Sequence, residues 1–80
     1  MSGAPGRDLD YEQRHLVKMA NQIALNVPGR TNIASQVATH MRSFWTPVMR
    51  ADIYAIAREH PEELAADVHG ALDQLRAVEA

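Results

Sequence analysis

Apolar residues recur at spacings of three and four along most of the chain, and this period is typical of helices with one buried face. In the first such pattern the apolar positions are Leu16, Met19, Ala20, Ile23 and Val27. Asp10 precedes the pattern as a candidate N-cap, and Gln13 follows it at the spacing of a capping-box partner. We therefore predict a helix over residues 11–27, which Pro28 and Gly29 end.

A second amphipathic pattern follows Thr31 and Asn32, and either of these residues can cap a helix. Its apolar stripe consists of Ile33, Val37, Met41 and Phe44, with the small residues Ala34 and Ala38 alongside. Small side chains permit another helix to pack closely at this position. We predict that this helix runs to about residue 45.

Proline residues divide the rest of the chain into two further helices. Thr46 and Pro47 are typical of an N-cap and a first helical residue, because proline lacks only an N–H that would have no helical partner there. This third helix should end before Pro61, which disfavours helical geometry in the residue before it. Its stripe is Met49, Ile53, Ile56 and Ala57.

Pro61, followed by two glutamates that favour the positive end of a helix dipole, predicts the start of a fourth helix. The stripe of this helix is Leu64, Val68, Ala71, Leu72 and Leu75. Gly70 lies within it and costs about 1 kcal/mol relative to alanine, which makes the helix marginal on its own.

These patterns predict an all-α fold, a small bundle of three to four short helices. No stretch alternates with a period of two, so we expect no strands. Gly3, Pro5 and Gly6 predict a flexible N-terminal tail over residues 1–9, and residues 10–80 should form a single helical domain.

The composition indicates that this domain depends on a partner. With 80 residues and no cysteine, it has no disulfides, and one core of this size supplies only about 3–5 kcal/mol of stability. No apolar run reaches the roughly 18 residues that span a bilayer. The first residues also lack the apolar segment of a signal peptide. We expect a cytoplasmic protein that does not enter a membrane.

The charge is unevenly distributed along the chain. Residues 1–51 hold six Lys or Arg and three Asp or Glu, whereas residues 52–80 hold two and seven. A nucleic-acid-binding protein more often has a basic total and clustered Lys and Arg. The bipolar pattern favours a protein partner instead.

The candidates for catalytic chemistry are weak. No two of the four histidines, His15, His40, His60 and His69, are spaced so that they share one helix face as metal ligands. The acids near residue 61 are more typical of a solvated helix start than of acid–base catalysis. No glycine-rich phosphate loop or nucleophile motif is present. We expect no catalytic, cofactor-binding or metal-binding residues in this chain.

The segment HMRSFWTPVMR, residues 40–50, holds the only Phe and the only Trp next to each other. If the chain bends at Thr46, Phe44 can continue the core stripe while Trp45 points away from it. Trp45 would then serve as an interface anchor with Arg42 and Arg50 beside it. The alternative is that both aromatic side chains lie in the core, on either side of the bend.

Two segments resemble the delta subunit of cytoplasmic NAD-dependent formate dehydrogenase. They are LVKMANQIA at residues 16–24 and HMRSFWTPVMR at residues 40–50. The most specific matching positions are Met19, Ala20, Asn21, Gln22 and Ile23, then His40, Phe44, Trp45, Pro47, Met49 and Arg50. Helical periodicity alone does not produce such a pair of motifs.

The resemblance implies a non-catalytic accessory subunit that binds the alpha subunit and supports assembly or stability of the complex. In that family, alpha carries a molybdenum or tungsten pterin centre and iron–sulfur clusters. Beta and gamma pass electrons through FMN and further clusters to NAD, and delta holds no cofactor. The residues that we expect to contact the partner are Asn21, Gln22, Arg42, Trp45 and Arg50.

A small helix-turn-helix DNA-binding protein is the alternative function, because the second and third helices are joined by a tight turn and the N-terminal half is basic. The third helix offers Arg50 and Arg58 to DNA, but Asp52 and Glu59 lie beside them.

Overall fold

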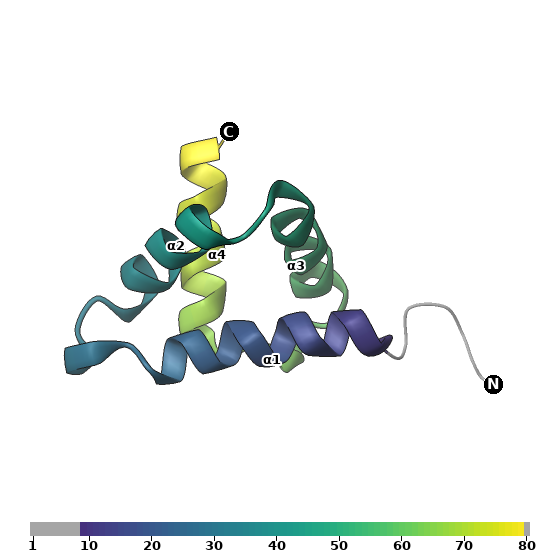
Figure 1. Cartoon of the computed structure of the whole chain (residues 1–80), viewed down its shortest axis with the longest axis horizontal. Coiled ribbons are helices and arrows are strands. Elements are labelled where there is room, and N and C mark those ends of the chain that lie inside the picture. The colour runs from purple at the N-terminus through teal and green to yellow at the C-terminus, as the bar shows by residue number, and fades with distance from the viewer. Residues whose placement is uncertain (1–8, 80) are drawn as a thin grey trace.

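Four α-helices make up most of the protein in a computed structural model that describes residues 9–79 (Figure 1). The helices are α1 (Tyr11–Leu25), α2 (Ile33–Phe44), α3 (Pro47–Glu59) and α4 (Ala66–Glu79). Two 3₁₀ turns, Pro28–Arg30 and Pro61–Glu63, lie before α2 and before α4. Residues 9–79 contain no strand, and the predicted all-α fold is confirmed. The predicted tail lies outside the described residues except for Leu9, which is buried.

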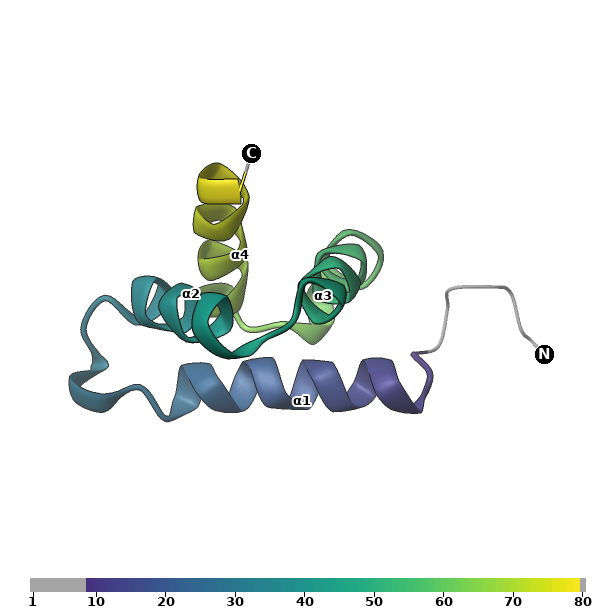
Figure 2. The same cartoon turned by 45° about the horizontal axis from the view of Figure 1, so that its top comes forward.

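Helix α1 forms one side of the molecule, and the other three helices lie across the same side of it, with α2 against α4 and α3 standing apart from that pair (Figures 1 and 2). The most extensive contact is between α2 and α4, and α1 contacts all three of the other helices. The helices therefore enclose one core.

Each helix contributes one face to this core. The buried helical residues are Leu16, Val17, Ala20 and Ala24 of α1, Val37, Ala38 and Met41 of α2, Ile53, Ile56 and Ala57 of α3, and Val68, Ala71, Leu72 and Leu75 of α4. The helical part of the predicted α4 stripe is confirmed in full. In α1 the buried face is turned slightly from the predicted stripe toward Val17 and Ala24, so that Met19 and Ile23 are only half-buried.

The predicted caps of α1 and α3 are confirmed, whereas the predicted cap of α2 is not, because Asn32 precedes that helix without a side-chain hydrogen bond to it. Asp10 Oδ1 accepts a hydrogen bond from Gln13 N at 2.8 Å, and Asp10 N donates to Gln13 Oε1 at 2.9 Å. Thr46 Oγ1 accepts from Met49 N at 3.1 Å, directly before Pro47 opens α3. These side chains satisfy N–H groups that have no partner within the helix.

Helix α1 ends at Leu25, two residues earlier than predicted. Val27 has an extended backbone with ψ 124°, which is the geometry that a following proline favours. Pro28 therefore ends the helix before it reaches Val27, although the Val27 side chain is still buried in the core.

The predicted start of the fourth helix at Pro61 is wrong. Residues 61–63 form a separate 3₁₀ turn, Leu64 is extended, and α4 begins at Ala66. The Asn21 side chain explains the break, since Nδ2 donates to the Glu63 carbonyl and Oδ1 accepts from Ala65 N, both at 2.9 Å. A residue of α1 thus fixes the chain that leads into α4.

Gly70 lies where α4 meets α2. A Cβ atom built at this glycine would lie 3.1 Å from the Cβ of Ala34, which is closer than two side chains normally pack. The glycine therefore permits a close approach of the two helices. This role accompanies the cost in helix propensity that is expected from a glycine inside a helix.

The two neighbouring aromatic residues have the reverse of the predicted positions. Trp45 is 5% exposed and belongs to the core, whereas Phe44 is 72% exposed. Trp45 follows Met41 by four residues, and its extended backbone (φ −91°, ψ 140°) ends α2, so its side chain turns toward α1. Both the expectation that Phe44 is core and the alternative that both rings are core are wrong.

Candidate partner-binding site

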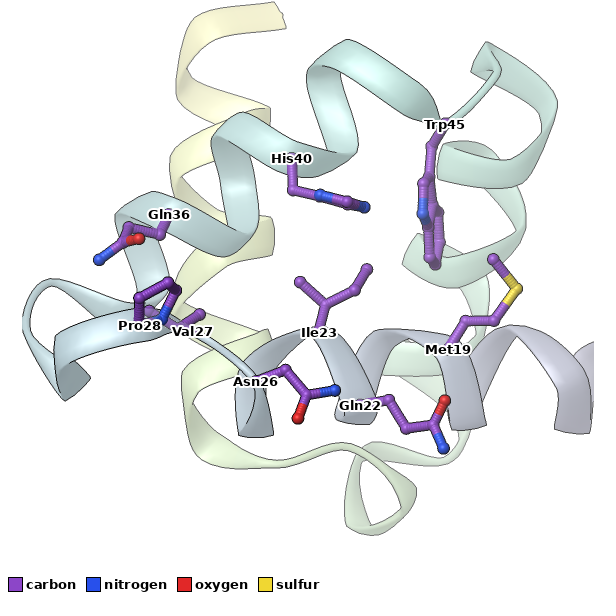
Figure 3. Close-up of a pocket in the computed structure, with 9 residues that line it drawn as sticks. All are labelled: Met19, Gln22, Ile23, Asn26, Val27, Pro28, Gln36, His40 and Trp45. Carbon is purple, nitrogen blue, oxygen red and sulfur yellow. The ribbon is translucent and has the colours of Figure 1, made fainter.

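A groove of about 440 Å³ lies between α1 and α2, and we name it the α1–α2 groove (Figure 3). Its lining residues are Met19, Gln22, Ile23, Asn26, Val27, Pro28, Gln36, His40 and Trp45. None of these side chains is an acid, a lysine or an arginine. The groove thus combines apolar, amide and imidazole groups.

The floor of the groove is apolar. Trp45 projects from the end of α2 toward α1, and Met19 and Ile23 project from α1 toward it (Figure 3). Trp45 and Val27 are buried, whereas Met19 and Ile23 are half-buried against the core. The floor is therefore the outer surface of the core, left open between two helices.

The two edges of the groove are polar. Gln22 of α1 and Asn26, the residue that caps the end of α1, lie one turn apart, and Gln36 and His40 lie one turn apart on α2. Gln36 Nε2 donates to the Thr31 carbonyl at 2.7 Å. The side chains of Gln22, Asn26 and His40 make no hydrogen bond to another residue within 9–79. Three of the four edge residues therefore have free polar groups toward solvent.

A second hollow adjoins the groove on the outer face of α2. It is lined by Asn32, Ser35, Gln36, Thr39, His40, Ser43 and Phe44. Gln36 and His40 line both hollows, so they form a ridge between them. The His40 ring lies against the Phe44 ring with centroids 4.8 Å apart. Phe44 is exposed, so the two rings together form an exposed aromatic surface beside the groove.

Two of the five predicted contact residues, Gln22 and Trp45, meet in the groove. Asn21 is instead engaged within the chain by its two hydrogen bonds to the segment before α4. Arg42 is exposed on α2 and does not line the groove. That these residues contact a partner stays a prediction.

Arg50, the fifth predicted residue, connects the end of α2 with the end of α4. Its Nη1 donates to the Trp45 carbonyl at 2.7 Å, and its Nε pairs with Glu79 Oε2 at 2.7 Å. The Tyr54 hydroxyl donates to the other oxygen of Glu79, also at 2.7 Å. Burial of the phenol, with this hydrogen bond and the negative charge of Glu79, raises the pKa of Tyr54 to about 12.

The sequence did not single out Asn26 or Gln36 as site residues, and it gave His40 only as part of a motif. Their common signal is a pair of polar residues four apart at the margin of an apolar stripe. Such pairs are frequent on helices. Only the packing of α1 beside α2 shows that these two pairs face one groove.

Within residues 9–79, no group of three or more His, Asp or Glu side chains is placed to hold a metal ion. No α-helix in the same stretch is both long and apolar enough to span a bilayer.

The fold and the groove together define a small all-α domain with one mixed polar and apolar surface. The family model for the delta subunit of NADH-dependent formate dehydrogenase (FdsD) matches residues 15–72, and this range includes every residue of the α1–α2 groove. The chain belongs to this family, which confirms the resemblance seen in its sequence motifs. Neither a search of curated proteins nor a search of solved structures returned a match.

Proposed function

We propose that this chain is a non-catalytic accessory subunit that binds the alpha subunit of a cytoplasmic, NADH-dependent formate dehydrogenase and supports assembly or stability of the complex. The observation that carries this proposal is the family match over residues 15–72. A delta subunit belongs to a multi-subunit enzyme, and a domain of this size gains stability from a partner.

In this proposal, formate oxidation takes place on the other subunits. Alpha holds a molybdenum or tungsten pterin centre and iron–sulfur clusters, and beta and gamma carry the electrons through FMN and further clusters to NAD. The chain contributes no thiolate to any cluster, since its sequence contains no cysteine. Its contribution is a protein surface.

The alternative of a helix-turn-helix DNA-binding protein receives no support, because the family that matches is an enzyme subunit.

Affinity purification of the tagged full-length chain from its own cells tests the proposed partner. Mass spectrometry should identify the alpha subunit as the most enriched protein, together with beta and gamma. A matched purification with the tag alone is the control. Enrichment of unrelated proteins without any formate dehydrogenase subunit would contradict the proposal.

Deletion of the chain tests the proposed role. We expect less assembled complex, while formate-dependent NAD reduction per assembled complex stays unchanged. A normal amount of complex with lost activity per complex would show instead that the chain takes part in catalysis.

A further inference from the structure

The two edges of the α1–α2 groove have a spacing that suits an extended peptide. Gln22 on α1 and Asn26 at its C-cap are four residues apart, as are Gln36 and His40 on α2. Four residues of helix rise roughly 6 Å, and two residues of an extended chain rise about 6.6 Å. The polar side chains along each edge can therefore meet alternate peptide groups of an extended segment.

A helical occupant fits these edges less well. The backbone N–H and C=O groups of a helix are already paired with each other, so a helical occupant could offer the amides of Gln22 and Asn26 only its side chains. An extended segment has free backbone groups that such side chains can bind. The unused polar groups on both edges thus favour an extended occupant.

The floor of the groove indicates what this segment carries. Alternate side chains of an extended chain point to the same side, and here that side is the surface of Met19, Ile23 and Trp45. A methionine adapts its shape to different apolar neighbours. We expect an apolar side chain of the occupant to lie on this floor.

The charge of the surrounding helices indicates the flanking residues. Residues 11–44, which form α1 and α2, contain four Lys or Arg and one acid. Residues 61–79, which lead into and form α4, contain five acids and one Arg. The lining of the groove is itself uncharged, but the helices on either side of it carry more basic than acidic residues, and this excess favours Asp or Glu beside the apolar residue of the occupant.

We infer that the α1–α2 groove binds an extended segment of the alpha subunit in which acidic residues flank an apolar side chain. The inference rests on the proposed function, because that function names the partner. A second copy of this chain is a poorer occupant, since its acidic residues lie largely on a helix.

The probe that tests the inference is a set of short overlapping peptides that span the alpha subunit, each with a fluorescent label. Titration with the purified full-length chain should identify a segment with an apolar residue between acids. The same segment without its label should change the emission of Trp45, the only tryptophan of the chain, because Trp45 lies in the floor of the groove.

Gln22→Glu adds a negative charge to the edge of the groove with almost no change of shape. We expect it to weaken the binding of both the peptide and the whole alpha subunit about tenfold or more. Gln74→Glu is the matched control, because it makes the same change on α4, outside the groove. It should bind like the unmodified chain, and thermal melts should show both variants folded.

The outcomes separate the inference from the proposed function. If the unmodified chain binds the alpha subunit and Gln22→Glu binds it equally well, the groove assignment is overturned and the proposed function stands. If the unmodified chain does not bind the alpha subunit, both are overturned. Selection of basic or helical peptides, or a dimer of this chain that Gln22→Glu dissociates, would also overturn the inference.

Discussion

Trp45 and Phe44 are neighbours in the chain, but their side chains lie in opposite environments. Trp45 is 5% exposed beside Met19 and Ile23, and Phe44 is 72% exposed against His40. Because the free energy of burial follows the apolar area removed from water, the two residues should differ in their effect on stability.

We predict that Trp45→Ala lowers the free energy of unfolding of the isolated chain by about 3–5 kcal/mol, since it leaves a cavity in the core. Phe44→Ala should change it by no more than about 0.5 kcal/mol. Urea denaturation followed by circular dichroism measures both, with Trp45→Phe as an intermediate variant if Trp45→Ala does not fold. A larger loss for Phe44→Ala than for Trp45→Ala would contradict the placement of the two rings.

Asn21 and Gln22 are adjacent amides with different partners. Asn21→Ala removes both hydrogen bonds to the segment before α4, and we predict a loss of about 1–2 kcal/mol in the free energy of unfolding. Gln22→Ala is the matched control and should leave this value unchanged, because Gln22 is exposed. Equal stability of the two variants in urea denaturation would show that the Asn21 bonds contribute nothing.

Tyr54 gives the stability a dependence on alkaline pH. Its pKa in the folded chain is raised to about 12, above the ordinary tyrosine value near 10. The stabilisation from the neutral phenol is therefore fully present below pH 10 and is lost as the pH rises toward 12.

We predict that the melting temperature of the unmodified chain falls more steeply than that of Tyr54→Phe above about pH 10. Thermal melts of the two proteins across this pH range measure the difference in melting temperature. Because both proteins share all other titrating groups, the contribution of those groups cancels in the comparison. Parallel curves would show that Tyr54 is not coupled to folding.

At the level of secondary-structure elements, the sequence predicts the helix starts and buried faces that depend on residues close together in the chain. Asp10 with Gln13, and Thr46 with Pro47, set the starts of α1 and α3 through contacts within one turn. The apolar stripes predicted most of the buried face of each helix, because the helical period can be recognised from residues only three or four positions apart. The start of α4 was mispredicted because it depends on Asn21, which is more than 40 residues away in the chain.

The crossing of α2 and α4 depends on one small residue. Because a Cβ at Gly70 would lie 3.1 Å from Ala34, we predict that Gly70→Leu lowers the free energy of unfolding by about 1–3 kcal/mol. Ala77→Leu is the matched control on the same helix and should have little effect, since Ala77 is exposed. Denaturation midpoints compare the two, and a stable Gly70→Leu variant would show that the helices can separate at low cost.

For the molecule as a whole, the candidate site was predictable only in part. The paired motifs indicated Gln22 and Trp45, and both residues line the groove. A family motif is recognised from the identity of its residues, so this prediction did not require knowledge of how the helices pack. Arg50 carried the same signal but serves an internal contact with Glu79. The second edge of the groove required the placement of α2 beside α1, which no local pattern encodes.

The proposed function requires that this chain binds the alpha subunit of a formate dehydrogenase. Isothermal titration calorimetry with the purified full-length chain and the purified alpha subunit tests it most directly. We predict saturable binding with one chain per alpha subunit. The absence of binding to the alpha subunit, while the chain remains folded by circular dichroism, would contradict the proposed function.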